Sequence, residues 1–404
     1  IYNGIVYKHH EILDSSTFRV DEKGFGDICE NLAHINSPYD FNAIPIHILG
    51  SIYERFLGKI ITVTDKRVRV EEKPEARKAG GVYYTPEYIV RYIVEATVGK
   101  LIAGKTPNQI AKMRFADISC GSGSFLINVF DLLINYHGQY YNDNPTKYRK
   151  GDCIKREGKL YVSLNKKREI LLNNIYGVDI DSQAVEVCKL SLYLRLLQEE
   201  TEASAQQYLM DFEHAARINK VLPDLTKNIV CGNSLVGTEI LDGKLFPRDE
   251  QRKINPMNFA DAFPEIKRRG GFDVVIGNPP YIFTRETIPV WEREYYSQKY
   301  VLTWEKQNTF MLFMERLLEI LAPSGQASYI VPNSWLTIES AKLLRERYLV
   351  HLQRVVDLNY PVFKGVSLEP SIFVAGRKNT QALIELARVK SADELISTKY
   401  ILTD

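Results

Sequence analysis

The sequence predicts an α/β fold in which a mostly parallel sheet is covered by helices on both faces. Short apolar runs that are typical of buried strands recur through most of the chain, and longer segments with helical spacing separate several of them. A glycine-rich turn joins one of these runs to a predicted helix. Strands that alternate with helices favour a parallel sheet, because each crossover helix covers a face of that sheet.

Seven strands are expected in this sheet. They span residues 114–118, 175–178, 228–231, 272–276, 327–331, 354–357 and 371–375. Helical spacing is clearest over residues 125–135, 182–198 and 310–321.

Residues before the α/β pattern have a different character. Residues 44–57 have helical spacing, and residues 60–71 are expected to form a hairpin. We therefore divide the chain into an N-terminal helical and connector region (1–80), an α/β domain (81–380) and the start of a linker (381–404).

The composition is ordinary for a globular protein. Hydrophobic residues make up 45% of the 404 residues and charged residues 25%, and no apolar run reaches the roughly 18 residues that span a membrane. Five cysteines without C-x-x-C spacing predict neither a zinc site nor a redox pair, and they fit a reducing cytoplasm. The first residues resemble neither an initiation site nor a signal peptide, so we interpret the chain as a fragment of a longer protein.

The charge is nearly balanced, with 52 basic and 50 acidic side chains. Neutralisation of phosphates supplies most of a protein's non-specific affinity for nucleic acid, so this balance predicts that the chain as a whole binds nucleic acid weakly. Basic clusters at residues 166–168 and 267–269 are candidates for lining a cleft, although short charge runs are usually solvated surface. Residues 136–167 are polar, aromatic and basic, and we interpret them as an insertion.

The first segment that carries chemistry is the glycine-rich turn, Asp117 to Phe125. Gly121 and Gly123 allow a tight turn and the close approach of a ligand to the backbone. The helix that follows offers free N–H groups to an anion. Because the segment matches neither G-x-G-x-x-G nor a P-loop, by itself it only weakly indicates a binding loop.

The second segment is Asp179-Ile180-Asp181, at the end of the next predicted strand. An acidic residue in this position can accept hydrogen bonds from both hydroxyls of a ribose. The alternative for Asp179 is N-capping of the following helix, which Asp181 serves equally well. The sequence leaves both roles of Asp179 open.

The third segment is Asn278-Pro279-Pro280-Tyr281, directly after the strand at 272–276. Two prolines can simply end a strand in a turn that Asn278 caps. The same residues also suit an aromatic amine, which is a poor nucleophile because its lone pair is delocalised. The Asn278 oxygen and the Pro279 carbonyl can each accept one N–H and leave a more pyramidal nitrogen, while Tyr281 stacks on the ring.

A Tyr84-Thr85-Pro86 motif precedes the glycine-rich turn, with Thr85 suited to N-cap a helix and Pro86 to begin it. The order of these four segments resembles the gamma-class DNA amino-methyltransferases, and in particular the adenine-N6 enzymes of the Eco57I-like type IIG restriction–modification branch, over roughly residues 81–378. This resemblance implies a Rossmann-like fold that uses S-adenosyl-L-methionine. It also implies methylation of a flipped-out adenine in double-stranded DNA, in a prokaryotic cytoplasm.

The resemblance further implies a role for each motif residue. Tyr84 and Thr85 would hold the methionine end of the cofactor, Asp179 its ribose, and Asn233 would lie near the adenine ring or the target base. Relatives often carry Asp at the position of Asn233. The other residues assigned to the cofactor are Asp117, Ser119, Gly121, Gly123 and Ile180. The catalytic residues are Asn278, Pro279, Pro280 and Tyr281, and Phe363 would stack on the base opposite Tyr281.

Several alternatives remain at this stage. Cytosine-N4 methylation follows the same chemistry, although its enzymes more often carry Ser in place of Asn278. Release-factor glutamine methyltransferases also use Asn-Pro-Pro-Tyr, but in shorter chains without the Tyr-Tyr-Thr-Pro segment. A catalytically idle recognition subunit would not need intact motifs. The resemblance also implies nuclease and target-recognition domains elsewhere in a full-length chain.

Overall fold

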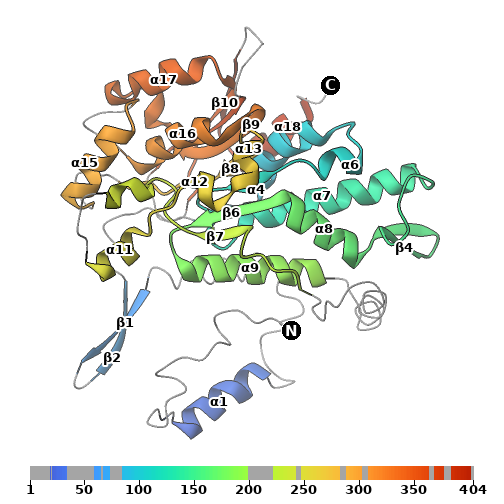
Figure 1. The fold of residues 1–404 in the computed structure, drawn as a ribbon, viewed down its shortest axis with the longest axis horizontal. Coiled ribbons are helices and arrows are strands. Elements are labelled where there is room, and N and C mark those ends of the chain that lie inside the picture. The colour runs from blue at the N-terminus through green and yellow to red at the C-terminus, as the bar shows by residue number, and fades with distance from the viewer. Residues whose placement is uncertain are drawn as a thin grey trace.

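An eight-stranded mixed sheet forms the centre of the molecule, in the order β12-β10-β11-β9-β8-β3-β6-β7 (Figure 1). The computed structural model describes residues 19, 21–33, 59–64, 67–72, 84–198, 222–242, 247–282, 288–302, 308–363, 368–376 and 384–401. The strands are β3 (Phe115–Asp117), β6 (Ile175–Asp179), β7 (Ile229–Cys231), β8 (Phe272–Gly277), β9 (Leu321–Pro332), β10 (Leu352–Leu358), β11 (Pro370–Gly376) and β12 (Glu385–Val389).

The sheet is mostly parallel, as the sequence predicts. Strands β7, β6, β3, β8 and β9 run parallel to one another, and β12 runs parallel to β10. Only β11 is antiparallel to both of its neighbours, β9 and β10. All seven predicted strands are present, so the predicted fold class is confirmed.

The predicted number of strands is wrong by one, because the sheet continues past residue 380. Strand β12 pairs with β10 in parallel, and the guanidinium of Arg354 on β10 forms an ion pair with Glu385 at 2.5 Å. Helix α18 (Ala392–Ile401) follows, and its Leu395 is fully buried. The residues expected to begin a linker therefore include an edge strand and a packed helix.

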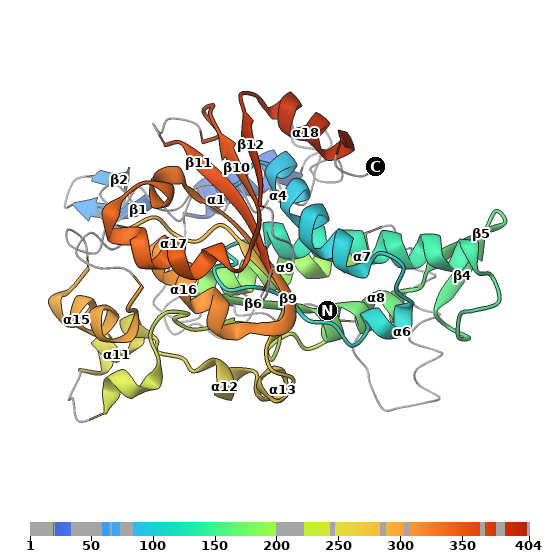
Figure 2. The same cartoon turned by 90° about the horizontal axis from the view of Figure 1, so that it is seen from above.

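Helices cover both faces of the sheet. In Figure 2, helices α16 and α17 lie on one side of β10–β12 and helices α4, α7 and α18 on the other. The principal helices are α4 (Glu87–Val94), α6 (Pro107–Ile110), α7 (Ser124–Asp143), α8 (Leu164–Asn174), α9 (Ser182–Leu197), α11 (Arg248–Ile254), α12 (Phe259–Ala262), α13 (Pro264–Arg268), α15 (Val290–Lys299), α16 (Thr309–Ile320) and α17 (Lys342–Leu349). The three predicted helices correspond to α7, α9 and α16.

The N-terminal region contributes helix α1 (Glu22–Ala33) and an antiparallel hairpin of β1 (Lys59–Thr64) and β2 (Arg67–Glu72). This hairpin confirms the one predicted over 60–71, whereas the helix predicted over 44–57 lies outside the described residues. The insertion contains a second hairpin, of β4 (Cys153–Arg156) and β5 (Lys159–Val162). No helix in the described part of the chain is long and apolar enough to cross a membrane.

The central strands are apolar on both faces because helices cover both. Strand β8 shows this most clearly, since its three consecutive residues Val274, Val275 and Ile276 are all fully buried. A strand of this kind cannot alternate polar and apolar residues. Its one carboxylate, Asp273, accepts a hydrogen bond from the backbone N–H of Arg114 at 2.8 Å, which ties β8 to the entry of β3.

Candidate active site

Four neighbouring parallel strands end at the same edge of the sheet, and the loops that follow them form one cavity. In the order β7, β6, β3, β8 these strands end at Cys231, Asp179, Asp117 and Gly277. Ligands of open α/β sheets bind at this carboxyl edge. The cavity has a volume of about 480 Å³. Of the residues predicted from sequence, it is lined by Thr85, Asp117, Ser119, Gly121, Asp179, Ile180, Asn233, Asn278 and Pro280.

The glycine-rich turn has the conformation that its glycines suggest. Gly123 has a φ of 92° in the left-handed region and forms the N-cap of α7. A Cβ at this position would lie 2.7 Å from the Cys188 sulfur on α9, so the turn and α9 can approach only because the residue is glycine. The turn is also held by Asp179, whose Oδ2 accepts the backbone N–H of Gly121 at 2.9 Å.

Asp117 is a buried carboxylate that faces the cavity. Its Oδ1 accepts the backbone N–H of Ser119 at 3.0 Å, whereas its Oδ2 is buried without a hydrogen-bond partner among the described residues. Burial raises the pKa of this carboxyl to about 7, and the nearby charge of Asp179 adds to the rise. Gly277 allows the close fit, since a Cβ there would lie 2.6 Å from Asp117 Oδ1. A cationic ligand group would compensate such a carboxylate.

The structure separates the two roles that the sequence left open for Asp179. Asp181 is the N-cap of α9, because its Oδ1 accepts the backbone N–H of Gln183 at 2.8 Å. Asp179 accepts the N–H groups of Gly121 and Asp181 instead, and burial raises its pKa. Asp179 thus braces two binding loops at the place where a ribose is expected.

Asn233 lines the cavity, but its amide is used within the protein. Its Oδ1 accepts the backbone N–H groups of Leu235 and Val236 at 2.9 and 3.2 Å, and its Nδ2 donates to the carbonyl of Ile254 at 3.2 Å. These bonds shape the loop after β7. An Asp in this position could not donate a hydrogen bond to Ile254, so the hydrogen bond explains why this chain carries Asn here.

Asn278 begins the loop after β8, and two neighbours fix its amide. Its Nδ2 donates to the hydroxyl of Thr85 at 3.0 Å, and its Oδ1 accepts the hydroxyl of Tyr281 at 2.5 Å. The predicted capping by Thr85 is wrong: helix α4 begins at Glu87 with Pro86 at the N-cap, and no side chain caps it. Thr85 instead joins the Tyr-Thr-Pro motif to the Asn-Pro-Pro-Tyr motif.

Tyr281 and Phe363 contact each other directly. Their ring centroids lie 6.4 Å apart with an angle of 71° between the ring planes, and both side chains are buried. The hydroxyl of Tyr281 also lies 2.9 Å from the carbonyl oxygen of Ile330. An edge-to-face pair leaves no parallel slot for a base, so this conformation does not display the sandwich expected from the sequence. The predicted residues that do not line the cavity are Tyr84, Gly123, Pro279, Tyr281 and Phe363.

Helices α15 and α16 supply cavity residues that the motifs did not reveal. Glu292 and Tyr296 lie one turn apart on α15, and the Tyr296 hydroxyl donates to Glu292 Oε1 at 2.6 Å. Burial raises the pKa of Glu292. Thr309 begins α16, and its hydroxyl donates to the carbonyl of Pro280 at 2.5 Å. The i, i+4 spacing of Glu292 and Tyr296 was the only signal in the sequence, and such spacing is common in helices.

The fold and the site together define a class. A glycine-rich turn follows the strand β3, acidic residues end β3 and β6, and an Asn-Pro-Pro-Tyr loop follows β8. All lie at one edge of a mostly parallel sheet that contains one antiparallel strand, β11. This is the Rossmann-like fold of S-adenosyl-L-methionine-dependent methyltransferases. Two solved structures share it. A DrdV–DNA complex matches 95% of this chain at a TM-score of 0.56, and the MmeI restriction–modification enzyme in complex with DNA matches 88% at 0.55, each with 15% identity.

Two family models identify the particular methyltransferase family that the chain matches. The N-6 DNA Methylase model matches residues 45–222, and the Eco57I restriction-modification methylase model matches residues 173–363. The type II restriction enzyme and methyltransferase RM.Eco57I of Escherichia coli is 32% identical over 363 residues. The adenine-specific methyltransferase PglX of Streptomyces coelicolor is 24% identical over 317 residues. The chain belongs to the Eco57I-like N6-adenine DNA methyltransferase family.

These relatives are much longer than the chain. It spans 33% of RM.Eco57I and 24% of PglX, while the matches cover 87% and 75% of the chain itself. The DrdV and MmeI chains are likewise matched over 34% and 43% of their lengths.

Proposed function

We propose that the chain is the catalytic part of a site-specific DNA methyltransferase that transfers a methyl group from S-adenosyl-L-methionine to N6 of adenine. The observation that carries the proposal is the position of Asn278, at the edge of the cavity with its amide oriented by Thr85 and Tyr281. A fixed amide oxygen beside a cofactor cavity is what activation of an exocyclic amine requires. Preorganised polar groups of this kind act without reorganisation during the reaction.

The cavity residues fit the cofactor. The methionine end of S-adenosyl-L-methionine carries positive charge, which suits the buried, unpartnered Oδ2 of Asp117. Asp179 retains lone pairs for the ribose hydroxyls, and the half-exposed Ile180 offers an apolar face to the adenine ring. The bound cofactor supplies an electrophilic methyl group. The protein residues then hold it in place and exclude water around it.

The target amine would lie against Asn278 and the backbone of Pro279. Each accepts one N–H, so the nitrogen lone pair turns towards the methyl group. In this orientation Nδ2 of Asn278 donates to Thr85, which leaves the amide oxygen to accept an N–H of the amine. Tyr281 orients the same amide, and a stacking role for Tyr281 and Phe363 requires their rings to separate when the base enters.

Adenine is favoured over the rival substrates. Cytosine N4 would use the same geometry, but the matching family model is an N-6 methylase and PglX is named adenine-specific. The release-factor glutamine reaction is not favoured either, because the matching N-6 DNA Methylase model describes a DNA-modifying enzyme.

We further propose that the chain works within a larger type II restriction–modification protein in a prokaryotic cytoplasm. Residues 81–380 would be its methyltransferase domain, extended by β12 and α18. Nuclease and target-recognition domains, with double-stranded DNA as the partner, are expected in the full-length protein because RM.Eco57I is both a restriction enzyme and a methyltransferase.

Expression of the full-length gene in a host that lacks adenine methylation tests this function. We expect long-read sequencing of the host DNA to show N6-methyladenine at one short motif, and an Asn278→Ala gene to leave that motif unmodified. Methylated cytosine at a motif that depends on Asn278 would replace the proposed substrate, and unmodified DNA from a stably folded protein would reject the activity.

A further inference from the structure

The insertion between α7 and α8 concentrates positive charge. Between residues 147 and 168 the sequence has nine lysines and arginines but only two carboxylates, a net charge of +7 in a chain whose total is +2. The rest of the chain is therefore net negative. The balanced total hides one strongly basic segment, and the local field of such a segment governs attraction of a polyanion.

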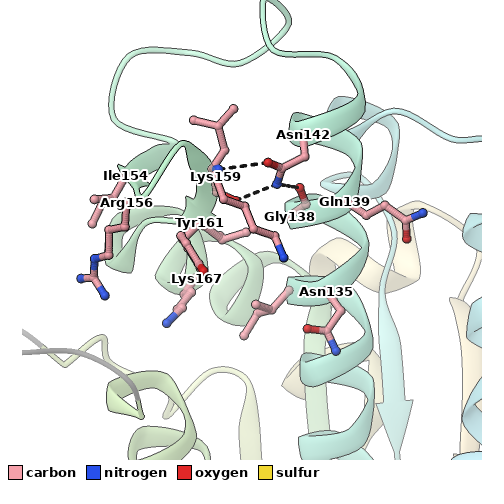
Figure 3. A pocket seen from close by; sticks show the side chains of 12 residues that line it. Asn135, Gly138, Gln139, Asn142, Ile154, Arg156, Lys159, Tyr161 and Lys167 are labelled. Atoms are coloured by element: carbon pink, nitrogen blue, oxygen red, sulfur yellow. Dashed lines mark hydrogen bonds between the residues drawn. The ribbon is translucent and has the colours of Figure 1, made fainter.

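This segment builds a hollow against the end of α7 (Figure 3). The hairpin β4–β5 stands beside the C-terminal half of α7, and α8 follows it. The cavity between them has a volume of about 390 Å³. It is lined by Ile134, Asn135, Gly138, Gln139, Asn142, Ile154, Arg156, Lys159, Leu160, Tyr161, Val162 and Lys167.

The lining is cationic and holds no carboxylate. Arg156 and Lys159 come from the hairpin and Lys167 from α8, while the amide side chains of Asn135 and Gln139 come from α7. The Lys159 ammonium lies 5.9 Å from the centre of the Tyr161 ring. Cations and amide donors without a lining anion are suited to a phosphate group.

The hairpin itself is held firmly in place. The amide of Asn142 on α7 bonds both the N–H and the carbonyl of Leu160, at 3.0 and 2.7 Å. The hydroxyl of Ser163 donates to the carbonyl of Gly151 at 2.5 Å, and the Lys166 ammonium on α8 lies 3.9 Å from Asp152 Oδ1 at the start of the hairpin. The cavity is therefore a built feature of the fold.

Basic side chains continue beyond the cavity in the same segment. Lys147, Arg149, Lys150 and Lys155 are exposed. Tyr148 and Tyr161 expose 37% and 45% of their surface. Exposed tyrosines among lysines and arginines are typical of surfaces that bind a nucleic-acid backbone, where cations neutralise phosphates and rings stack.

We propose that this hairpin surface, defined as residues 147–161 with Lys167, binds the phosphodiester backbone of duplex DNA that flanks the target site. The hollow contacts α7 between residues 134 and 142, so it lies about 15–27 Å along that helix from the glycine-rich turn that precedes residue 124. The hairpin surface therefore contacts a flanking stretch and not the target base. Only the choice of DNA as the polyanion rests on the proposed function.

Duplex length and two matched variants of the full chain test this proposal. One variant is Arg156→Gln with Lys159→Gln, in the hollow. Its control is Lys342→Gln with Arg347→Gln on α17, which removes the same charge from exposed side chains elsewhere. Fluorescence anisotropy measures binding to duplexes of about 8 and 40 base pairs over a range of salt. The short duplex extends only about 14 Å to either side of its centre, so it falls short of the hollow when it is centred on the active site.

On the long duplex, we expect the hollow variant to bind several-fold more weakly and to lose about 1.8 from the slope of log K against log salt, because each phosphate contact contributes about 0.9. On the short duplex it should match the wild type, and the control should match on both. Equal binding of all three proteins, or an equal loss in the control, would overturn the proposal.

Titration calorimetry with ATP tests whether the hollow binds the phosphates of a free nucleotide instead of those of DNA. Binding of ATP that the hollow variant abolishes, with unchanged affinity for the long duplex, would make the surface a nucleotide site instead.

These measurements do not depend on methyl transfer. An inactive chain that still shows the length-dependent loss would contradict the proposed enzymatic activity and leave the hairpin surface supported. Because Arg156 and Lys159 are exposed, both variants should keep the wild-type unfolding temperature.

Discussion

At the residue scale, burial explains why a carboxyl group at position 117 suits a cationic ligand and has a raised pKa. Its second oxygen is buried without a partner, and its pKa lies near 7 because it is removed from water. Sequence alone assigned Asp117 to the cofactor through the motif but gave no reason for a carboxylate there. Such a reason needs the burial, which comes from the close approach of β8 at Gly277.

Cofactor affinity should therefore depend on pH through Asp117. The cationic methionine end requires the ionised carboxyl, so below a pH of about 7 a proton must leave before binding. Affinity then falls as pH falls, towards tenfold per unit, and levels off above pH 8. Asp179, Cys120 and Tyr329 are titratable groups that interact with Asp117, and the pKa values of Cys120 and Tyr329 lie well above their ordinary ranges. Titration calorimetry from pH 5.5 to 8.5 measures the profile.

The Asp117→Asn variant identifies the group responsible. It should bind more weakly and with little dependence on pH. A profile retained in Asp117→Asn would move the titration to Asp179, and a flat wild-type profile would contradict the pairing of Asp117 with the cation.

At the scale of elements, the positions of the strands in the sequence were predictable, whereas the residues that line the site were only partly so. Parallel strands buried on both faces leave unbroken apolar runs, which is why all seven predicted strands were found. Thr85 was misjudged because its residue type suits an N-cap, whereas its partner, Asn278, lies 193 positions away. Glu292 was missed because α15 carries no motif. Such contacts depend on tertiary packing, which local sequence patterns do not encode.

The glycine-rich turn depends on the packing of α7 beside α9. Gly123→Ala should weaken cofactor binding at least tenfold and lower the unfolding temperature, because its Cβ would lie 2.7 Å from the Cys188 sulfur and its φ is in the left-handed region. Gly104→Ala is the matched control: it shares a positive φ of 72°, but nothing lies within 4 Å of the added Cβ. Calorimetry and thermal melts compare the two. Equal behaviour of both variants would show that the turn tolerates the displacement of Cys188.

For the whole molecule, the C-terminal residues 384–401 complete the sheet. Val389 and Leu395 are buried, and the Arg354–Glu385 pair crosses from β10 to β12. The sequence predicted a linker here because no further strand was recognised after residues 371–375, and residues 377–381 are polar. An edge strand that follows such a break is short and carries little signal of its own.

A chain that ends at residue 380 should therefore be less stable than one that ends at 401. Burial of Val389 and Leu395 alone contributes about 1.5–3 kcal/mol each. We expect the free energy of unfolding, measured by urea denaturation, to fall by several kcal/mol. Identical midpoints for the two chains would restore the linker interpretation.

The identity of the methylated atom is the central claim for the whole molecule. Incubation of the full-length protein with methyl-labelled S-adenosyl-L-methionine and duplex DNA, followed by digestion to nucleosides and mass spectrometry, measures it directly. We predict labelled N6-methyldeoxyadenosine. Asn278→Ala should reduce it by at least about a hundredfold while cofactor affinity stays unchanged, since loss of one positioned hydrogen-bonding group costs about 3–4 kcal/mol. Labelled N4-methyldeoxycytidine, or full activity in Asn278→Ala, would contradict the account.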